Sequence, residues 1–305
     1  MKIVDVHTHG IGGFDTRTTS AEHILGIAKI QGSLGVSEIV PTVYPASIRT
    51  MREHMHAIKE AMETQVSGRY ESIPAEDQGS AAGSSKPEAK IIGIHLEGPF
   101  LNPLKCGALD TGSFLKPDKD SVIKLIDGFD DVVKIITIAP ELEGAVDIIK
   151  EISGKGIIAS MGHSDATYAE AEAGFHAGAR GITHIFNAMR GIHHREPGLA
   201  GFGLINQDIY IEVIADQFHL DRKVIEFIFS VKNPDRIIII SDSVKASHMI
   251  RTSHGIRNAN NRLLGGSVSL NQAAEHLIET GLDRVIVLRA ISDNPQEYLR
   301  FRYID

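Results

Sequence analysis

The chain has 305 residues, of which 42% are hydrophobic and 23% are charged. These proportions are typical of a folded globular protein and exclude a disordered, collagen-like or coiled-coil chain. Lysine and arginine number 31 against 39 aspartates and glutamates, a formal net charge of −8, which argues against a broadly basic surface for nucleic acid or an anionic membrane. The single cysteine, Cys106, cannot form an internal disulfide. With neither a signal-peptide pattern nor an apolar run long enough to span a membrane, we expect a cytoplasmic protein.

Short runs rich in β-branched residues alternate with longer amphipathic stretches. The predicted strands are 2–9, 38–44, 90–98, 132–140, 156–164, 181–189, 210–219 and 236–243, and the predicted helices include 20–34, 47–63, 143–153, 167–177 and 221–231. This alternation predicts βα units with right-handed crossovers around a parallel sheet. Eight such units in a chain of this length favour an α/β fold of the closed (β/α)8, or TIM-like, barrel type, with a doubly wound open sheet as the alternative.

Residues 65–89 depart from the alternation. They are rich in serine, glycine, alanine, proline and glutamate and show no apolar period, which predicts a flexible surface insertion. The insertion connects a helix to a strand and therefore lies on the barrel face opposite the active site. We expect a single domain over residues 1–305, with an insertion that carries no catalytic residue.

Histidines and carboxylates gather where the predicted strands end. His7 and His9 lie one residue apart on the first strand, so their side chains leave the same face. The later strands carry, at or near their carboxyl ends, Glu97, His163, His184, His219 and Asp242. These ends form the catalytic face of a (β/α)8 barrel, where crowded imidazoles and carboxylates are best compensated by a divalent cation. The sequence therefore predicts a metal centre.

Six segments make this prediction specific. They are GIHLEGPFLN (93–102), MGHSDATYAEA (161–171), THIFNAM (183–189), HREPG (194–198), IADQFH (214–219) and SDS (241–243). In this order they resemble the N-acetylglucosamine-6-phosphate deacetylases of the amidohydrolase superfamily, and the match covers nearly the whole chain. The resemblance implies a metal-dependent hydrolase that removes the acetyl group from N-acetylglucosamine 6-phosphate in amino sugar catabolism.

The resemblance also implies individual roles. Glu97, His163 and His184 match the ligands of the family's main metal, and Asp242 matches its catalytic aspartate. His7 and His9 match the superfamily's first-strand pair, which some members have lost, so we expect one or two ions, with Glu97 bridging if there are two. His219 resembles the histidine that polarises the acetyl carbonyl. The positions that hold the sugar phosphate correspond to Ala108, Asn187, Ala188, Arg195, His219, Leu264 and Gly265.

The implied chemistry is consistent with these residue types. A divalent metal lowers the pKa of its bound water, and Asp242 can take the water proton and later deliver it to the leaving amine. Histidine and carboxylate ligands suit zinc, iron, manganese, cobalt or nickel. The Arg195 guanidinium has a planar fork that suits phosphate oxygens, and in the homodimer that we expect it serves a neighbouring subunit's site.

The chain departs from the family pattern in several places. Family members carry a small β-sandwich formed before and after the barrel; this chain begins at the first barrel strand and ends soon after the last helix, so we expect that domain to be absent. Gln217 stands where glycine is usual, and Ser243 where alanine is commoner. Two alternatives stay open: an amidohydrolase acting on another N-acyl or cyclic amide substrate, and a metal-binding barrel with little turnover.

Overall fold

The computed structural model describes residues 1–67, 87–249 and 254–300. Its main sheet contains eight parallel strands in the order of the chain. They are β1 (Val4–Thr8), β4 (Glu38–Val43), β6 (Ile94–Glu97), β7 (Val133–Ile138), β8 (Ile158–Met161), β9 (Gly181–Ile182), β10 (Tyr210–Ile214) and β11 (Ile237–Ile240). The short strand β5 (Lys90–Ile91) pairs with β4 outside this series. The prediction of a (β/α)8 barrel is confirmed.

The barrel closes where β1 meets the residues that follow β11. Thr8 and Ser243 form a parallel bridge, and the His9 amide donates to the Ser243 carbonyl at 2.7 Å. The Thr8 and Ser243 hydroxyls lie 2.7 Å apart, and the Gln31 side chain donates to both at 3.3 Å. The Ser243 hydroxyl, which an alanine would lack, therefore ties the last strand to the first.

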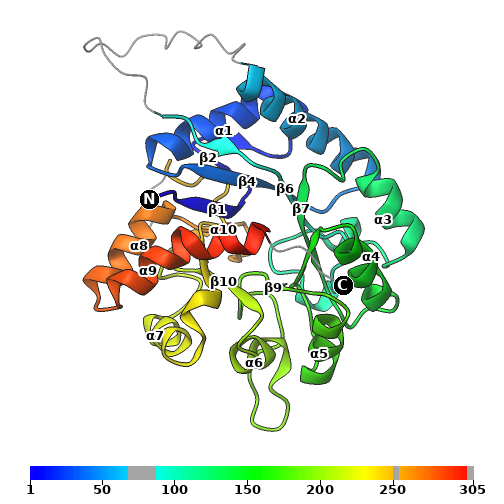
Figure 1. Cartoon of the computed structure of the whole chain (residues 1–305), viewed down its shortest axis with the longest axis vertical. Coiled ribbons are helices and arrows are strands. Elements are labelled where there is room, and N and C mark those ends of the chain that lie inside the picture. Colours follow the sequence, from blue (N-terminus) through cyan, green and yellow to red (C-terminus); the bar gives the residue numbers. More distant parts are fainter. Residues whose placement is uncertain (68–86, 250–253, 301–305) are drawn as a thin grey trace.

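Helices surround the barrel (Figure 1). They are α1 (Ala21–Ser33), α2 (Ile48–Ser67), α3 (Lys119–Ile126), α4 (Ala145–Gly154), α5 (Tyr168–His176), α6 (Gly198–Ile205), α7 (Arg222–Val231), α8 (Leu270–Glu279), α9 (Arg284–Ile291) and α10 (Asp293–Arg300). Several begin at a side chain that caps the first turn, as Ser20 does for α1 and Thr167 for α5. Within the described residues, no helix has both the length and the apolarity to cross a membrane.

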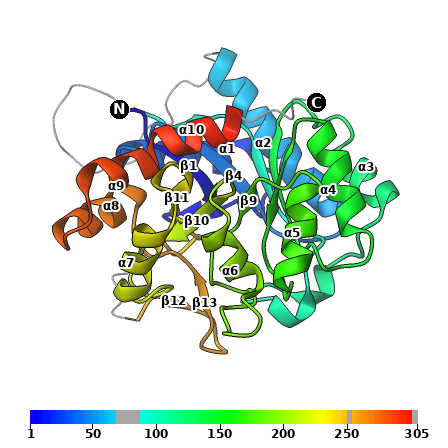
Figure 2. The ribbon, with the colours of Figure 1, turned by 60° about the horizontal axis from the view of Figure 1, so that its bottom comes forward.

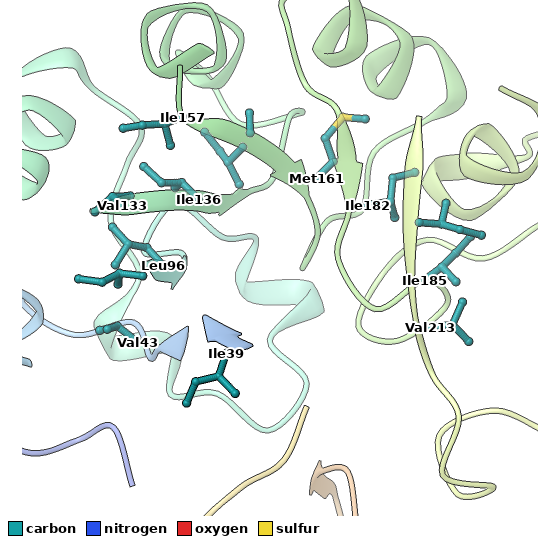
Figure 3. Close-up of a cluster of buried hydrophobic side chains, with 14 of the residues drawn as sticks. Ile39, Val43, Leu96, Val133, Ile136, Ile157, Met161, Ile182, Ile185 and Val213 are labelled. Atoms are coloured by element: carbon teal, nitrogen blue, oxygen red, sulfur yellow. The ribbon is translucent and has the colours of Figure 1, made fainter. Parts of the chain in front are cut away.

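Two hydrophobic layers hold the strands in place. The larger lies between the strands and the surrounding helices and includes Ile39, Leu96, Ile136 and Met161 (Figure 3). The smaller fills the barrel interior and includes Val6, Ile135 and Ile238. Because nearly every strand residue is buried on both faces, the strands read as continuous apolar runs rather than as alternating patterns.

Helix α10 lies across the amino-terminal end of the barrel (Figure 1). Its Tyr298 is fully buried in the inner layer, with its ring 4.9 Å from that of Tyr210 at the start of β10. Asn294 donates to the carbonyls of Pro234 and Ile237 at 2.7 Å. With this end covered, the carboxyl ends of the strands form the face that is open to a ligand.

Two small antiparallel hairpins lie beyond the barrel strands. One pairs β2 (Gly10–Ile11) with β3 (Phe14–Asp15), and the other pairs β12 (Ile256–Arg257) with β13 (Leu263–Gly265). Figure 2 shows the second hairpin below β10 and β11, on the side of the barrel opposite α10. This hairpin follows the last barrel strand and borders the pocket described below.

Two strand predictions were wrong in part. Of the predicted strand 181–189, only Gly181–Ile182 is extended, because His184, Phe186 and Ala188 take positive φ angles and the chain turns. The predicted strand 90–98 is divided between β5 and β6 at Ile92 and Gly93. A side chain at Gly93 would meet the Val132 carbonyl at 2.9 Å, so the chain passes too close to its neighbour for other residues.

Only the two ends of the predicted flexible insertion, residues 65–67 and 87–89, lie within the described part of the chain. Residues 65–67 form the last turn of α2, and Ala89 is buried and donates its amide to the Ala28 carbonyl. Residues 68–86 lie outside the described residues. The expectation of a single domain over 1–305 stays a prediction.

Candidate metal centre and pocket

A pocket of about 520 Å³ opens at the carboxyl ends of the strands. Six of the residues predicted for the metal centre and catalysis line it: His9, Glu97, His163, His184, His219 and Asp242. His7 is fully buried directly beneath them. The structure therefore brings together seven side chains from six segments of the chain.

Glu97, the last residue of β6, lies at the centre of the cluster. Its Oε1 is 3.1 Å from His163 Nε2 and 3.0 Å from His184 Nε2. Its Oε2 is 3.2 Å from His9 Nε2, and its Oε1 is 3.7 Å from His7 Nε2. One carboxylate thus faces both histidine pairs, which is the arrangement a bridging ligand needs.

Asp242 follows β11 and faces the first-strand pair. Its Oδ1 lies 3.4 Å from His7 Nε2 and 3.6 Å from His9 Nε2. The side chains therefore fall into two potential ligand groups, one of Glu97 with His163 and His184, the other of Asp242 with His7 and His9.

The hydrogen bonds of the ring Nδ1 atoms show which nitrogen faces the cluster. His9 Nδ1 lies 3.0 Å from the Thr42 carbonyl, and His163 Nδ1 lies 2.9 Å from the Lys105 carbonyl. A carbonyl only accepts, so in both rings Nδ1 carries the hydrogen and the neutral ring directs an Nε2 lone pair inward. His7 Nδ1 lies 3.2 Å from Glu212 Oε2, which favours the same tautomer.

The inward lone pairs fit a cation. His7 Nε2 and His9 Nε2 are 3.3 Å apart, and in this tautomer neither can donate to the other. Likewise, His163 Nε2 and Glu97 Oε1 face each other as two acceptors at 3.1 Å. Buried acceptors facing one another are unfavourable unless positive charge lies between them, and imidazole with carboxylate is a donor set that divalent transition metals take.

A third group, formed by His7, His95 and Glu212, does not fit a metal in the same way. His95 Nδ1 lies 3.1 Å from the Val6 carbonyl, and its Nε2 lies 2.8 Å from the Thr137 hydroxyl. Both ring nitrogens are therefore engaged, and the ring supports the barrel interior beneath the cluster.

Three residues of the cluster adopt backbone conformations that side chains disfavour. The φ angles of His163, His184 and Asp242 are 46°, 32° and 45°. Non-glycine residues in this region carry strain and are concentrated at functional sites. Each follows the end of a strand, and the local turn directs its side chain into the pocket.

Burial and charge shift the pKa values of the cluster in opposite directions. Burial raises the pKa of Asp242 well above its ordinary range, and the nearby carboxylate of Glu97 adds to the effect. Burial also opposes ionisation of Glu97, but the histidines around it outweigh this effect and hold its pKa well below the ordinary value. Burial lowers the pKa of His7, which keeps this ring neutral. The cluster thus contains one readily ionised carboxylate, one that resists ionisation and a neutral imidazole.

The sequence analysis placed His219 in the site but missed Asp216, the residue that orients it. His219 Nδ1 lies 3.1 Å from both carboxylate oxygens of Asp216, which also accepts from the backbone amides of Phe218 and His219. Burial raises the pKa of Asp216, but the bonds and charge of His219 outweigh it and leave the pKa below its usual value. The intervening Gln217 has a φ of 68°, where glycine is favoured. Position within IADQFH was the available signal for Asp216, three residues before the histidine.

The predicted substrate contacts are only partly brought together. Ala108, Asn187, Ala188 and Leu264 line the pocket with His219. Gly265 does not line it but packs against the Asp242 backbone, where an added Cβ would come within 2.5 Å of the carbonyl oxygen. Arg195 does not line the pocket of its own chain; its guanidinium lies 2.8 Å from His194 Nε2 on an exposed loop. Its role in a neighbouring subunit's site stays a prediction.

The pocket rim carries positive residues that sequence reasoning did not single out. They are Lys105, Arg257 and Arg262. Arg257 ends β12 and Arg262 immediately precedes β13. Nothing in their sequence context identifies them, because only the folded hairpin places them at the pocket.

Comparison with known proteins provides an independent line of evidence. No family model matches the chain. The sequence is 28% identical over 309 residues to the N-acetylgalactosamine-6-phosphate deacetylase of Escherichia coli O157:H7, covering 97% of this chain and 76% of that protein. It is 31% identical over 244 residues to the N-acetylglucosamine-6-phosphate deacetylase of Bacillus subtilis, covering 80% of this chain and 57% of that protein. The alignments thus span between 57% and 76% of these relatives' length.

Among solved structures, the N-acetyl-D-glucosamine-6-phosphate deacetylase of Mycobacterium smegmatis matches with a TM-score of 0.83 and 26% identity, covering 98% of this chain and 77% of that chain. A substituted form of the same enzyme, with the same score and coverage, was solved in complex with N-acetyl-D-glucosamine-6-phosphate. These matches confirm the resemblance drawn from the six sequence segments.

Proposed function

Because the chain is a homologue of the N-acetylglucosamine-6-phosphate deacetylases of the amidohydrolase superfamily, we propose that it hydrolyses N-acetylglucosamine 6-phosphate to acetate and glucosamine 6-phosphate. The observation that carries the proposal is Asp242, which faces both the pocket and the His7–His9 pair. Candidate metal ligands next to a buried carboxylate that can transfer a proton favour a hydrolytic function over binding alone.

The metal belongs to the proposal. We expect one or two divalent ions: Glu97, His163 and His184 would hold the first, and His7 and His9, which also face Glu97 and Asp242, would hold a second. Zinc, iron, manganese, cobalt and nickel all suit these ligands. When bound, a divalent ion supplies activation of water and polarisation of the acetyl carbonyl.

The chain's own residues then carry the protons and the charge. Asp242 takes a proton from the attacking water and delivers it to the amide nitrogen, so that the carbon–nitrogen bond breaks with a neutral amine leaving. Negative charge that develops on the carbonyl oxygen is stabilised by His219, whose ring is held in place by the ionised Asp216. Proton transfer thus rests on Asp242 and stabilisation of charge on the Asp216–His219 pair, which follow the neighbouring strands β11 and β10.

The proposal also includes the protein's location in the cell and its oligomeric state. We expect the enzyme to act in the cytoplasm, where phosphorylated sugars are retained, and to form a homodimer. In that dimer Arg195 reaches the pocket of the neighbouring subunit. Chemical cross-linking with mass spectrometry would test this, because Arg195 lies away from the pocket of its own chain.

The deciding experiment is acetate release from N-acetylglucosamine 6-phosphate by purified protein whose metal content has been measured. N-acetylgalactosamine 6-phosphate and unphosphorylated N-acetylglucosamine are assayed in parallel. The first is included because one similar protein is an N-acetylgalactosamine-6-phosphate deacetylase. Release that needs the phosphate and stops with a chelator supports the proposal. Metal-loaded protein that releases no acetate from either phosphorylated sugar contradicts it and favours another amide substrate or a barrel with little turnover.

A further inference from the structure

The hairpin formed by β12 and β13 places two arginines on the pocket rim. Arg257 and Arg262 both line the pocket, whereas Arg195 lies away from it. The hairpin belongs to the same chain as the metal ligands, so these guanidinium groups are present without a neighbouring subunit. Their surroundings indicate what they bind.

Both guanidinium groups are held by neutral carbonyls. Arg257 donates from Nε to the His254 carbonyl at 2.8 Å and from Nη1 to the Asn261 carbonyl at 2.8 Å. Arg262 donates from Nη1 to the Gly107 carbonyl at 2.7 Å. Carbonyl acceptors fix the orientation of a guanidinium without neutralising its charge.

Neither arginine is paired with an acidic side chain. Across residues 1–67, 87–249 and 254–300, no carboxylate forms an ion pair with Arg257 or Arg262. The third cation of the rim differs, because Lys105 pairs with Asp165 at 3.1 Å. Several N–H donors of the two arginines therefore stay available for an anion.

The charged side chains of the pocket differ in sign between its base and its rim. Its base holds the carboxylates Glu97 and Asp242 among the histidines, and its rim holds the unpaired arginine charges. A ligand with an uncharged amide at one end and an anionic group at the other matches this distribution, with the amide directed to the base. Arg262 also connects the rim to the loop at Gly107, so the anion would lie where two segments meet.

We propose that Arg257 and Arg262 bind the phosphate of the substrate from within the same chain and set the preference for phosphorylated over unphosphorylated sugar. This rests on the proposed function for the identity of the substrate. It adds an intrachain anion site to the contact expected from Arg195 of another subunit.

The test compares Arg257→Ala, Arg262→Ala and the double variant with wild type. For each, kcat/KM is measured on N-acetylglucosamine 6-phosphate and on N-acetylglucosamine. We expect the ratio of the two values to fall about 10- to 100-fold in each single variant, mainly through KM for the phosphorylated sugar, because a charge-assisted hydrogen bond is lost. Arg262→Lys should recover only part of the ratio, since it keeps the charge but loses the planar fork.

Arg284→Ala is the matched control, since Arg284 begins α9 and does not line the pocket. It should leave the ratio unchanged. Equal losses on both sugars in the hairpin variants, or an unchanged ratio in them together with a large fall in Arg195→Ala, would overturn the proposal.

A binding measurement separates this inference from the proposed activity. Isothermal titration with inorganic phosphate should detect binding to metal-loaded wild type that the double variant weakens at least about tenfold. If no sugar is deacetylated but this difference is found, the anion site holds and the deacetylase assignment fails. If wild type and double variant bind phosphate equally, the anion site is refuted whatever the activity.

Discussion

Single hydrogen bonds decide which way the site's imidazoles face. His9 and His163 are fixed by backbone carbonyls, and His7 is fixed by the carboxylate of Glu212. Glu212 lies on β10, more than 200 residues from His7, and is almost fully buried. Such partners fix the orientation of an imidazole and increase its basicity. The cluster therefore depends in part on Thr42 and Glu212, which do not line the pocket.

Asp242→Asn should abolish turnover while preserving the fold and the metal. Asparagine keeps the shape of the side chain but cannot take and return a proton, so we expect kcat to fall by about 10²- to 10⁴-fold. The measurements are acetate release and metal content of the same preparation. Turnover within about threefold of wild type would remove Asp242 from proton transfer.

Asp216→Asn should impair the reaction by a different route. Its amide can still contact His219 but no longer carries the negative charge that lies against the ring, so we expect kcat to fall about 10- to 1,000-fold with little change in metal content. The loss should fall on kcat rather than on KM, because the charge of Asp216 acts on the developing negative charge of the carbonyl oxygen and not on the bound substrate. A loss shared equally by kcat and KM would indicate that Asp216 only supports the loop.

The predicted ligands and the missed residues differ in how visible they are in the sequence. His163, His184 and Asp242 stand at the ends of recognisable strands, so barrel geometry alone brings them together. Glu212 and Arg262 gain their roles from contacts with residues more than 150 positions away. No local pattern encodes such contacts. This is why the cluster of histidines and carboxylates was predictable, whereas the residues that orient it and the arginines of the pocket rim were not.

At the scale of elements, the apolar runs predicted strand positions better than strand lengths. The runs at 132–140 and 236–243 contain β7 and β11 because buried strands with two covered faces are apolar throughout. Residues 183–189 were also predicted to be a strand but form a turn, in which the Ile185 amide donates to the Glu212 carbonyl. Tertiary hydrogen bonding of this kind overrides local preference.

Lys232 ties two helices together and should make stability depend on pH. It caps α7, and its buried amine donates to the carbonyls of Gly203 and Asn206 at the end of α6. Burial, aided by Arg236, lowers the pKa of Lys232 from 10.5 to about 7. Between these values the unfolded chain holds one more proton than the folded chain, so this group's contribution to stability rises with pH, by at most about 1.4 kcal/mol per unit.

Urea unfolding of wild type and Lys232→Met at pH 7, 8 and 9 tests this dependence. The difference in the free energy of unfolding should shift in favour of wild type as the pH rises, since methionine removes the titrating group. Lys223→Met, on the exposed side of α7, is the control and should show a constant difference. A constant difference for Lys232→Met as well would contradict the lowered pKa.

At the scale of the whole molecule, the cluster connects strands from around the entire barrel. His7 and His9 come from β1 and the residue just after it, Glu97 from β6, and His163, His184 and Asp242 from the ends of β8, β9 and β11. Strand β1 is also where the barrel closes against Ser243. An ion on these side chains would therefore link segments that are distant along the chain, and its removal should lower the stability of the whole fold.

Chelation should accordingly lower the thermal stability of the protein. A ligand present at a thousand times its Kd adds about 4 kcal/mol to the free energy of unfolding, so we expect the melting temperature of metal-loaded wild type to fall by several degrees after exhaustive chelation and to recover on addition of zinc or manganese. In Glu97→Gln, which loses the carboxylate shared by both histidine pairs, the melting temperature should respond weakly to chelator and metal. Scanning calorimetry of both proteins, with metal content measured before and after chelation, provides the comparison. Equal responses in wild type and Glu97→Gln would place the stabilising ion elsewhere and refute the metal centre at the carboxyl ends of the strands.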